Sequence, residues 1–252
     1  MMASAERDVG AGIFAGLAGA TVVVVGASSG MGLATATAAA AAGADVVIVA
    51  RDPGRLDEAR RSIGGSTRAF ALDGADADAV EAMFAELGAV DHVASFTGEQ
   101  PSGSVADTTH DQYRRALDAR VWAARNLCAS ASPRMPAGGS FTFCSGLSAW
   151  RPRPLRAAGA AATGALEAYA RGMAVELAPI RVNTVCPGSF DTPVLDRAFG
   201  DRKAEALQPY LSSLPLARLG RPEELAHAVL FLMTNGYVTG TVLHIDGGSL
   251  LI

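Results

Sequence analysis

Lysine is almost absent from this chain of 252 residues, because Lys203 is the only one and arginine supplies the other basic side chains. Charge of either sign is also sparse: charged residues make up 18% of the chain, and the net charge is -4. Binding to nucleic acid requires a strongly basic surface, so we expect no nucleic-acid partner. The sequence holds no run of about eighteen apolar residues, so we expect no membrane-spanning helix.

Cysteine is scarce as well. Cys128, Cys144 and Cys186 form an odd set with apolar or small neighbours, which predicts buried, reduced thiols in a cytosolic protein. No two of them have the spacing of metal ligands, so we expect no metal site. The first residues, Met1–Gly16, lack the basic region and apolar core of a secretion signal. We interpret them as a flexible extension of a cytoplasmic protein.

Short apolar runs alternate with helical patterns along the rest of the chain. The two longest predicted helices are Asp111–Ser130 and Ala157–Ala178. Continuous Val/Ile strands that alternate with helices indicate parallel strands covered on both faces. We therefore predict one Rossmann-type, doubly wound α/β/α domain over residues 17–252, with a parallel sheet of about seven strands. The predicted strands are Thr21–Val25, Asp45–Ala50, Thr67–Leu72, Asp91–Phe96, Gly139–Cys144, Arg181–Cys186 and Thr241–Ile245.

The segment Asp191–Leu219 interrupts this alternation. It is polar, contains Pro193, Pro209 and Pro215, and follows a predicted strand end. Ligands of such sheets bind at the carboxyl ends of the strands. The segment is therefore either a lid over a substrate or a plain surface excursion.

A glycine-rich loop joins the first predicted strand to the first helix. A pyrophosphate needs backbone N–H groups that point at it, and glycine leaves the approach open. The helix that begins near Gly30 adds the positive end of its dipole. Because strand, loop and helix are all in place, we predict a dinucleotide site rather than a structural turn. The loop residues are Gly26, Ser28, Ser29, Gly30, Met31 and Gly32.

The end of the second strand bears on the choice between NADP and NAD. An NAD site usually places an acidic side chain there for the ribose hydroxyls. This chain instead has Ala50 followed by Arg51, whose guanidinium can fork onto a 2′-phosphate. We expect NADP (NADPH) and regard NAD as the less favoured cofactor. The alternative is that Arg51 is a solvated loop residue next to Asp52.

Several short motifs follow the glycine loop in a characteristic order. An acidic residue follows the third predicted strand, and a glycine follows the fourth. The later motifs are Arg-Val-Asn, Pro-Gly, Thr-Pro, Thr-Gly and Asp-Gly-Gly. The residues are Asp73, Gly98, Arg181-Val182-Asn183, Pro187-Gly188, Thr192-Pro193, Thr239-Gly240 and Asp246-Gly247-Gly248. Over about Leu17–Leu250 the chain thus resembles the short-chain dehydrogenase/reductase family.

That resemblance implies further cofactor contacts, at Asp73 for the adenine and at Gly98, Pro187, Gly188 and Thr192. It also implies oxidoreductase activity on a small-molecule substrate. Members of the family assemble as dimers or tetramers through two long helices and the last strand. We therefore expect a homodimer or homotetramer.

The family's catalytic residues are missing. The resemblance implies a serine, a tyrosine thirteen residues later, a lysine four residues after that, and an upstream asparagine. These positions fall on Gly146, Gly159, Thr163 and Arg120. A small insertion does not hide the pair, because the residue four before Lys203 is a phenylalanine. The chain therefore lacks the Tyr-x-x-x-Lys acid.

Other polar groups can compensate for the missing acid. Ser145 and Thr163 carry hydroxyls near the expected substrate oxygen, and Ser148 is a weaker candidate. Arg120 cannot release its proton but can stabilise a developing alkoxide. The structural alternatives are an ion pair of Arg120 with Asp118 or Asp91, and a strand-end turn at Ser145.

We weigh three functions. The first is an atypical NADPH-dependent ketoreductase that acts on a bulky, activated carbonyl, such as an aromatic natural product. The second is a non-redox cyclase, dehydratase or isomerase on the same scaffold. The third is a non-catalytic NADP-binding subunit or sensor, since a fold alone does not determine function.

Overall fold

The computed structural model describes residues 14–252, so the predicted extension Met1–Gly16 lies almost wholly outside the described residues. Within them, parallel strands form a seven-stranded sheet in the order β3-β2-β1-β4-β5-β6-β7. The strands are β1 (Thr21–Val25), β2 (Asp45–Ala50), β3 (Arg68–Ala71), β4 (His92–Ser95), β5 (Ser140–Cys144), β6 (Arg181–Pro187) and β7 (Val242–Ile245). This confirms the predicted doubly wound α/β fold. The winding reverses between β1 and β4, and ligands of such sheets bind at this switch point.

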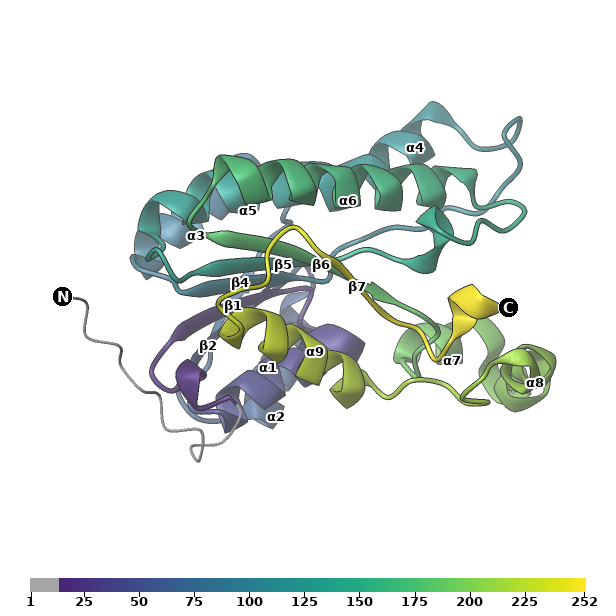
Figure 1. Cartoon of the computed structure of the whole chain (residues 1–252), viewed down its shortest axis with the longest axis horizontal. Helices are drawn as coiled ribbons and strands as arrows, with labels where there is room; N and C mark the ends of the chain where they lie inside the picture. The colour runs from purple at the N-terminus through teal and green to yellow at the C-terminus, as the bar shows by residue number, and fades with distance from the viewer. Residues whose placement is uncertain (1–13) are drawn as a thin grey trace.

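Helices cover both faces of the sheet (Figure 1). On one face α1, α2 and α9 pack against the sheet, and on the other face α3, α5 and α6 do so. Helix α4 continues toward α5 and contacts α6, while α7 and α8 lie beyond the end of β6. The helices are α1 (Gly30–Ala41), α2 (Pro53–Ile63), α3 (Ala77–Leu87), α4 (His110–Leu117), α5 (Ala123–Ala131), α6 (Ala157–Glu176), α7 (Pro193–Phe199), α8 (Lys203–Ser213) and α9 (Pro222–Thr234).

The valines of β1 explain why both faces need cover. Val22 and Val24 belong to one buried cluster, and Val23 and Val25 belong to the other. Successive side chains of a strand point to opposite faces, so a continuous valine run requires an apolar layer on each side. The glycine loop that follows β1 is thus held by a rigid, fully buried strand.

The predicted helix Asp111–Ser130 is not regular. Helices α4 and α5 are joined by a π-helical turn, Asp118–Trp122. A π turn holds an extra residue, so it changes which side chains face inward. Arg120 is buried in this turn, while Trp122 is exposed.

The segment from 191 to 219 contains α7 and α8, and its two ends lie together. Phe190 and Gly220 form an isolated parallel bridge, and the amide of Asp191 donates to the carbonyl of Gly220 at 2.8 Å. The segment is therefore an excursion closed at its base, beside the carboxyl end of β6. Whether it acts as a lid stays a prediction.

Candidate active site

The loop between β1 and α1 has the backbone that a pyrophosphate cradle requires. Gly26 and Gly30 have φ of 82° and 56°, in the left-handed region that glycine favours. A Cβ at Gly32 would lie 2.3 Å from the carbonyl oxygen of Gly26, so no side chain fits there. The side chain of Ser29, the N-cap of α1, makes no capping hydrogen bond. The first amides of α1 thus remain available to an anion, and the residues present fit a dinucleotide.

The residues at and after the end of β6 form the wall of the predicted cofactor site that lies opposite the glycine loop. A Cβ at Gly30 would lie 3.3 Å from Cγ2 of Thr192, so the loop and this wall approach closely. Gly188 packs against the backbone of Asp246, since a Cβ there would lie 2.7 Å from its Cα. The structure therefore brings Thr192 against the glycine loop and Gly188 against the backbone that follows β7.

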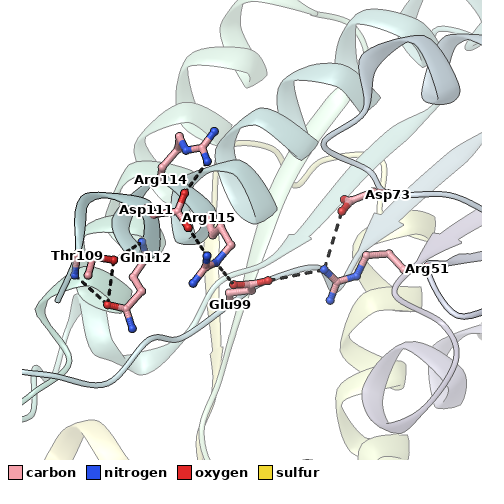
Figure 2. Close-up of polar contacts among 8 residues, drawn as sticks. All are labelled: Arg51, Asp73, Glu99, Thr109, Asp111, Gln112, Arg114 and Arg115. Atoms are coloured by element: carbon pink, nitrogen blue, oxygen red, sulfur yellow. Dashed lines mark hydrogen bonds and ion pairs between the residues drawn. The ribbon is translucent and has the colours of Figure 1, made fainter.

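Arg51 lies between two carboxylates (Figure 2). Its Nη1 is 3.9 Å from Oδ2 of Asp73 and 3.6 Å from Oε1 of Glu99. The Arg51 side chain is 68% exposed, so water surrounds both ion pairs and weakens them. Exposed ion pairs contribute at most about 1 kcal/mol, which leaves the guanidinium available to a stronger anion. Glu99 was not predicted as a site residue from the sequence, although it directly follows Gly98.

Glu99 connects this end of the site to α4. Its Oε2 lies 3.5 Å from Nε of Arg115, and Arg115 also pairs with Asp111 (Figure 2). A capping box between Thr109 and Gln112 fixes the start of this helix. Glu99 therefore keeps a basic neighbour when Arg51 moves away.

The positions onto which the resemblance maps the family's serine, tyrosine and lysine do come together in space. A Cβ at Gly159 would lie 3.9 Å from Cγ of Gln100 and 4.0 Å from Oγ of Ser148. A Cβ at Gly146 would lie 3.6 Å from Nε2 of Gln100 and 3.6 Å from Cγ2 of Thr163. Gln100, which the sequence did not single out, therefore borders the place where the family's acid is expected.

Two of the expected hydroxyls are already engaged. Thr163 Oγ1 donates to the carbonyl of Gly159 at 2.9 Å or of Ala160 at 3.0 Å, and it lies 3.1 Å from Oγ of Ser148. Ser145 is buried and donates to Oε1 of Glu167 at 2.7 Å. Compared with the hydroxyls of Thr163 and Ser145, that of the half-buried Ser148 has the fewest hydrogen bonds within the described part of the protein.

Glu167 is a further residue that the sequence did not single out. It is 3% exposed and accepts from Ser145 on one oxygen and from Nε1 of Trp150, at 2.9 Å, on the other. The carboxylate thus fixes the Trp150 ring, which is half exposed beside the site. Glu167 follows Thr163 by one helical turn, so helix spacing could have indicated that the two share a face.

Arg120 is buried, with 6% of its surface exposed. Its Nη1 donates to the carbonyls of Cys144 at 3.0 Å and Ser145 at 3.4 Å. The guanidinium lies directly behind Gly98, where a Cβ would be 2.6 Å from its Cζ. It therefore occupies the gap between the carboxyl ends of β4 and β5.

The ion pair considered for Arg120 does not form. Within residues 14–252 neither Asp118 nor Asp91 pairs with it, and Asp91 instead accepts from the amide of Thr21 at 2.8 Å. Nε of Arg120 is buried without a hydrogen-bond partner among these residues. Burial lowers the pKa of Arg120, but guanidinium stays protonated in proteins. The site thus holds a cation without a counter-ion.

The arginines of the loop before α6 bind to the protein itself. Arg151 donates to the carbonyl of Ser249 at 2.8 Å, and Arg153 lies 4.9 Å above the Tyr210 ring. The three cysteines are buried and unpaired in the described part of the chain, as expected.

Residues 14–252 contain no cluster of side chains able to hold a metal ion. None of the helices in this range has the length and hydrophobicity of a membrane-spanning segment.

Comparison with known proteins identifies the family. The family described as enoyl-(acyl carrier protein) reductase matches residues 26–249. Short-chain dehydrogenase/reductase ATR9 of Stachybotrys chlorohalonatus is 31% identical over 253 residues, which cover 92% of this chain and 98% of that protein. The chain belongs to the short-chain dehydrogenase/reductase family.

Solved structures agree with this assignment. MalC reductase/Diels-Alderase from Malbranchea aurantiaca has a TM-score of 0.88 at 28% identity, covering 94% of this chain and 98% of its own. L-sorbose reductase from Gluconobacter frateurii, in complex with NADPH and L-sorbose, has a TM-score of 0.86 at 28% identity, with the same coverage of 94% and 98%.

In this short-chain dehydrogenase/reductase the single lysine is used elsewhere. Lys203 begins α8 and pairs with Asp191 and with Asp196, the latter at 2.6 Å. These contacts lie within the excursion after β6. The lysine is therefore part of that segment and does not belong to α6, which carries Gly159 and Thr163.

Proposed function

We propose that this chain is an NADP(H)-dependent oxidoreductase that reduces a bulky, activated carbonyl compound, such as an aromatic secondary metabolite, without a tyrosine acid. The observation that carries the proposal is the combination of an open backbone cradle at Gly26–Gly32 with Gly159 and Thr163 at the acid and lysine positions. The cofactor half of the site has what binding needs, and the proton-donating half differs from the family pattern.

In this proposal the cofactor is held by contacts along the switch point of the sheet. The amides of Gly26–Gly32 bind the pyrophosphate, Arg51 binds the 2′-phosphate and Asp73 meets the adenine. The nicotinamide end of the cofactor would lie between Gly98 on one side and Gly188 on the other. Bound NADPH supplies the hydride. Support comes from L-sorbose reductase, a similar structure determined with NADPH.

The protein's own residues then orient the carbonyl and stabilise its charge. Arg120 stabilises the negative charge that develops on the carbonyl oxygen. Ser148, backed by Thr163, hydrogen-bonds the substrate, and water supplies the proton. A positioned acid contributes about 10²–10⁴ in rate, whereas orientation contributes about 7–11 kcal/mol. Losing the tyrosine therefore slows reduction without preventing it.

A second candidate function is a cyclisation in the same pocket. It is favoured by the similarity to MalC, whose description names both a reductase and a Diels-Alderase. Such a reaction needs shape and electrostatics more than a proton donor, which suits a site with glycine at the acid position. In this case NADPH is bound but not consumed.

Fluorescence titration with NADPH and NADH tests the cofactor half. We expect NADPH to bind more tightly, and Arg51→Gln to weaken NADPH by about tenfold, the strength of one charge-assisted contact. Arg55→Gln, which removes an exposed arginine from α2, is the matched control and should leave both affinities unchanged. If NADPH does not bind, the proposal and every NADP-dependent alternative fail.

Turnover then separates the candidate functions. NADPH oxidation is measured against quinones and polycyclic ketones. Consumption of NADPH together with a reduced product supports the oxidoreductase. A product isomeric with the substrate, without NADPH consumption, supports the cyclase. Tight NADPH binding with neither reaction supports a non-catalytic NADP-binding protein.

A further inference from the structure

The guanidinium of Arg120 is a buried charge that no group in the described chain neutralises. Its hydrogen bonds go to two carbonyl oxygens, of Cys144 and Ser145, and its Nε has no partner within residues 14–252. Buried charges in proteins are normally paired with an opposite charge, because desolvation is costly. An arginine without a counter-ion therefore indicates that the counter-ion arrives with a ligand.

The acidic side chains of the described residues do not supply the missing charge. No carboxylate among them forms an ion pair with Arg120, and the buried Glu167 contacts Ser145 and Trp150 instead. The thiols of Cys144 and Cys186 lie close enough to interact with Arg120, but burial raises their pKa values to about 11 and about 12. Both thiols are therefore neutral at physiological pH.

The position of the guanidinium suits a ligand bound at the carboxyl end of the sheet. It lies behind Gly98, an exposed glycine whose missing side chain would collide with the guanidinium. It also borders the carboxyl ends of β4 and β5, where ligands of this fold bind. Its hydrogen bonds with the described chain are made through Nη1, so in the described chain no hydrogen bond engages Nη2.

We propose that Arg120 is the recognition site for a negatively charged oxygen of the substrate, either a carboxylate or an ionised enol or phenol. This inference rests on the proposed function, because it names the class of carbonyl compound that the same site accepts. Arg120 then neutralises a charge that the substrate already carries, in addition to the charge that develops during reduction. The planar fork of arginine matches such oxyanions.

A purely structural role predicts the opposite effect on stability. If Arg120 serves to tie β5, its replacement breaks two hydrogen bonds and lowers the melting temperature. If it is an uncompensated charge kept for a ligand, a similar apolar side chain relieves the desolvation penalty and raises the melting temperature. Arg120→Met therefore discriminates between the roles without any substrate.

The binding test uses matched pairs of probes, measured by calorimetry with and without NADPH. The enolate pair is 2-hydroxy-1,4-naphthoquinone, which is anionic at neutral pH, against 1,4-naphthoquinone. The carboxylate pair is 2-naphthoate against 2-naphthamide. We expect the anion of at least one pair to bind about tenfold or more tightly than its neutral partner, as for one charge-assisted contact. The pair that shows the preference identifies the kind of oxyanion.

Variants then assign the preference to Arg120. Arg120→Met should abolish it and Arg120→Lys should retain part of it, while Arg125→Met, at an exposed position of α5, should leave it unchanged. Absence of a preference in both pairs, its survival in Arg120→Met, or a lower melting temperature of Arg120→Met would overturn the inference. If the inference about Arg120 fails but the protein still binds NADPH and turns over substrate, the proposed function is unaffected. Loss of NADPH binding alone overturns only that function.

Discussion

At the scale of single residues, the cofactor preference depends on a competition for Arg51. Its guanidinium lies within ion-pair distance of Asp73 and Glu99, and a 2′-phosphate would have to replace at least one of them. Glu99 loses little in the exchange, because Arg115 remains beside it. Under the proposed function, these ion pairs in the free protein would lower its affinity for NADPH.

We predict that Glu99→Gln raises the affinity for NADPH by up to about fivefold, since an exposed ion pair contributes at most about 1 kcal/mol. The affinity for NADH, which lacks the phosphate, should stay the same. Fluorescence titration measures both. Asp111→Asn is the control, because Asp111 pairs with Arg114 and Arg115 and not with Arg51. Weaker NADPH binding in Glu99→Gln would mean that Glu99 itself binds the cofactor.

At the scale of elements, two glycines in helices differ in the space available for a side chain. Gly32 in α1 lies against the carbonyl of Gly26, so a side chain there forces the loop apart. Gly159 in α6 has free space, because the nearest atoms to its missing Cβ are at ordinary contact distance. The first glycine thus allows the close approach of the loop, whereas the second lies where a methyl group would fit.

We predict that Gly159→Ala stabilises the protein by up to about 1 kcal/mol, because alanine restricts the unfolded chain and suits a helix. NADPH binding should be unchanged. Gly32→Ala should weaken NADPH binding at least tenfold and lower the melting temperature. Thermal unfolding and fluorescence titration provide the measurements. Wild-type NADPH affinity in Gly32→Ala would contradict the cradle.

At the scale of the whole molecule, acid stability depends on a buried histidine. His92 is 7% exposed, its Nδ1 lies 2.9 Å from Oγ of Ser140, and burial lowers its pKa to about 4, against the opposing influence of Asp91. The unfolded chain, in which the pKa is about 6.5, takes up a proton before the folded protein does. The free energy of unfolding should therefore fall as the pH drops from about 6.5 to about 4, by about 3 kcal/mol.

Urea unfolding across this pH window measures the effect. His92→Asn retains a polar contact to Ser140 but cannot be protonated, so its stability should depend less on pH. Equal pH dependence in the two proteins would show that other groups are responsible.

The fold could be predicted from the sequence because β1 and β2 are nearly continuous valine and isoleucine runs, and the later apolar segments alternate with helical patterns. The glycine loop could be placed because its function requires particular backbone conformations. The neighbours of the site were harder to predict. Glu99 and Gln100 lie on a loop whose path depends on tertiary packing, and nothing in the sequence marks the π turn that buries Arg120. The expected homo-oligomer stays a prediction, which sedimentation can test.

The central claim is that this site transfers hydride without the tyrosine acid. The most direct measurement is transfer of deuterium from NADPH labelled at C4 of the nicotinamide to a polycyclic ketone, because the secondary alcohol formed keeps the transferred hydrogen on carbon, with the product analysed by mass spectrometry and NMR. We predict deuterium at the former carbonyl carbon, on one face only for a prochiral ketone, and a lower rate in Arg120→Met. An unlabelled product isomeric with the substrate, formed without loss of NADPH, would contradict the claim.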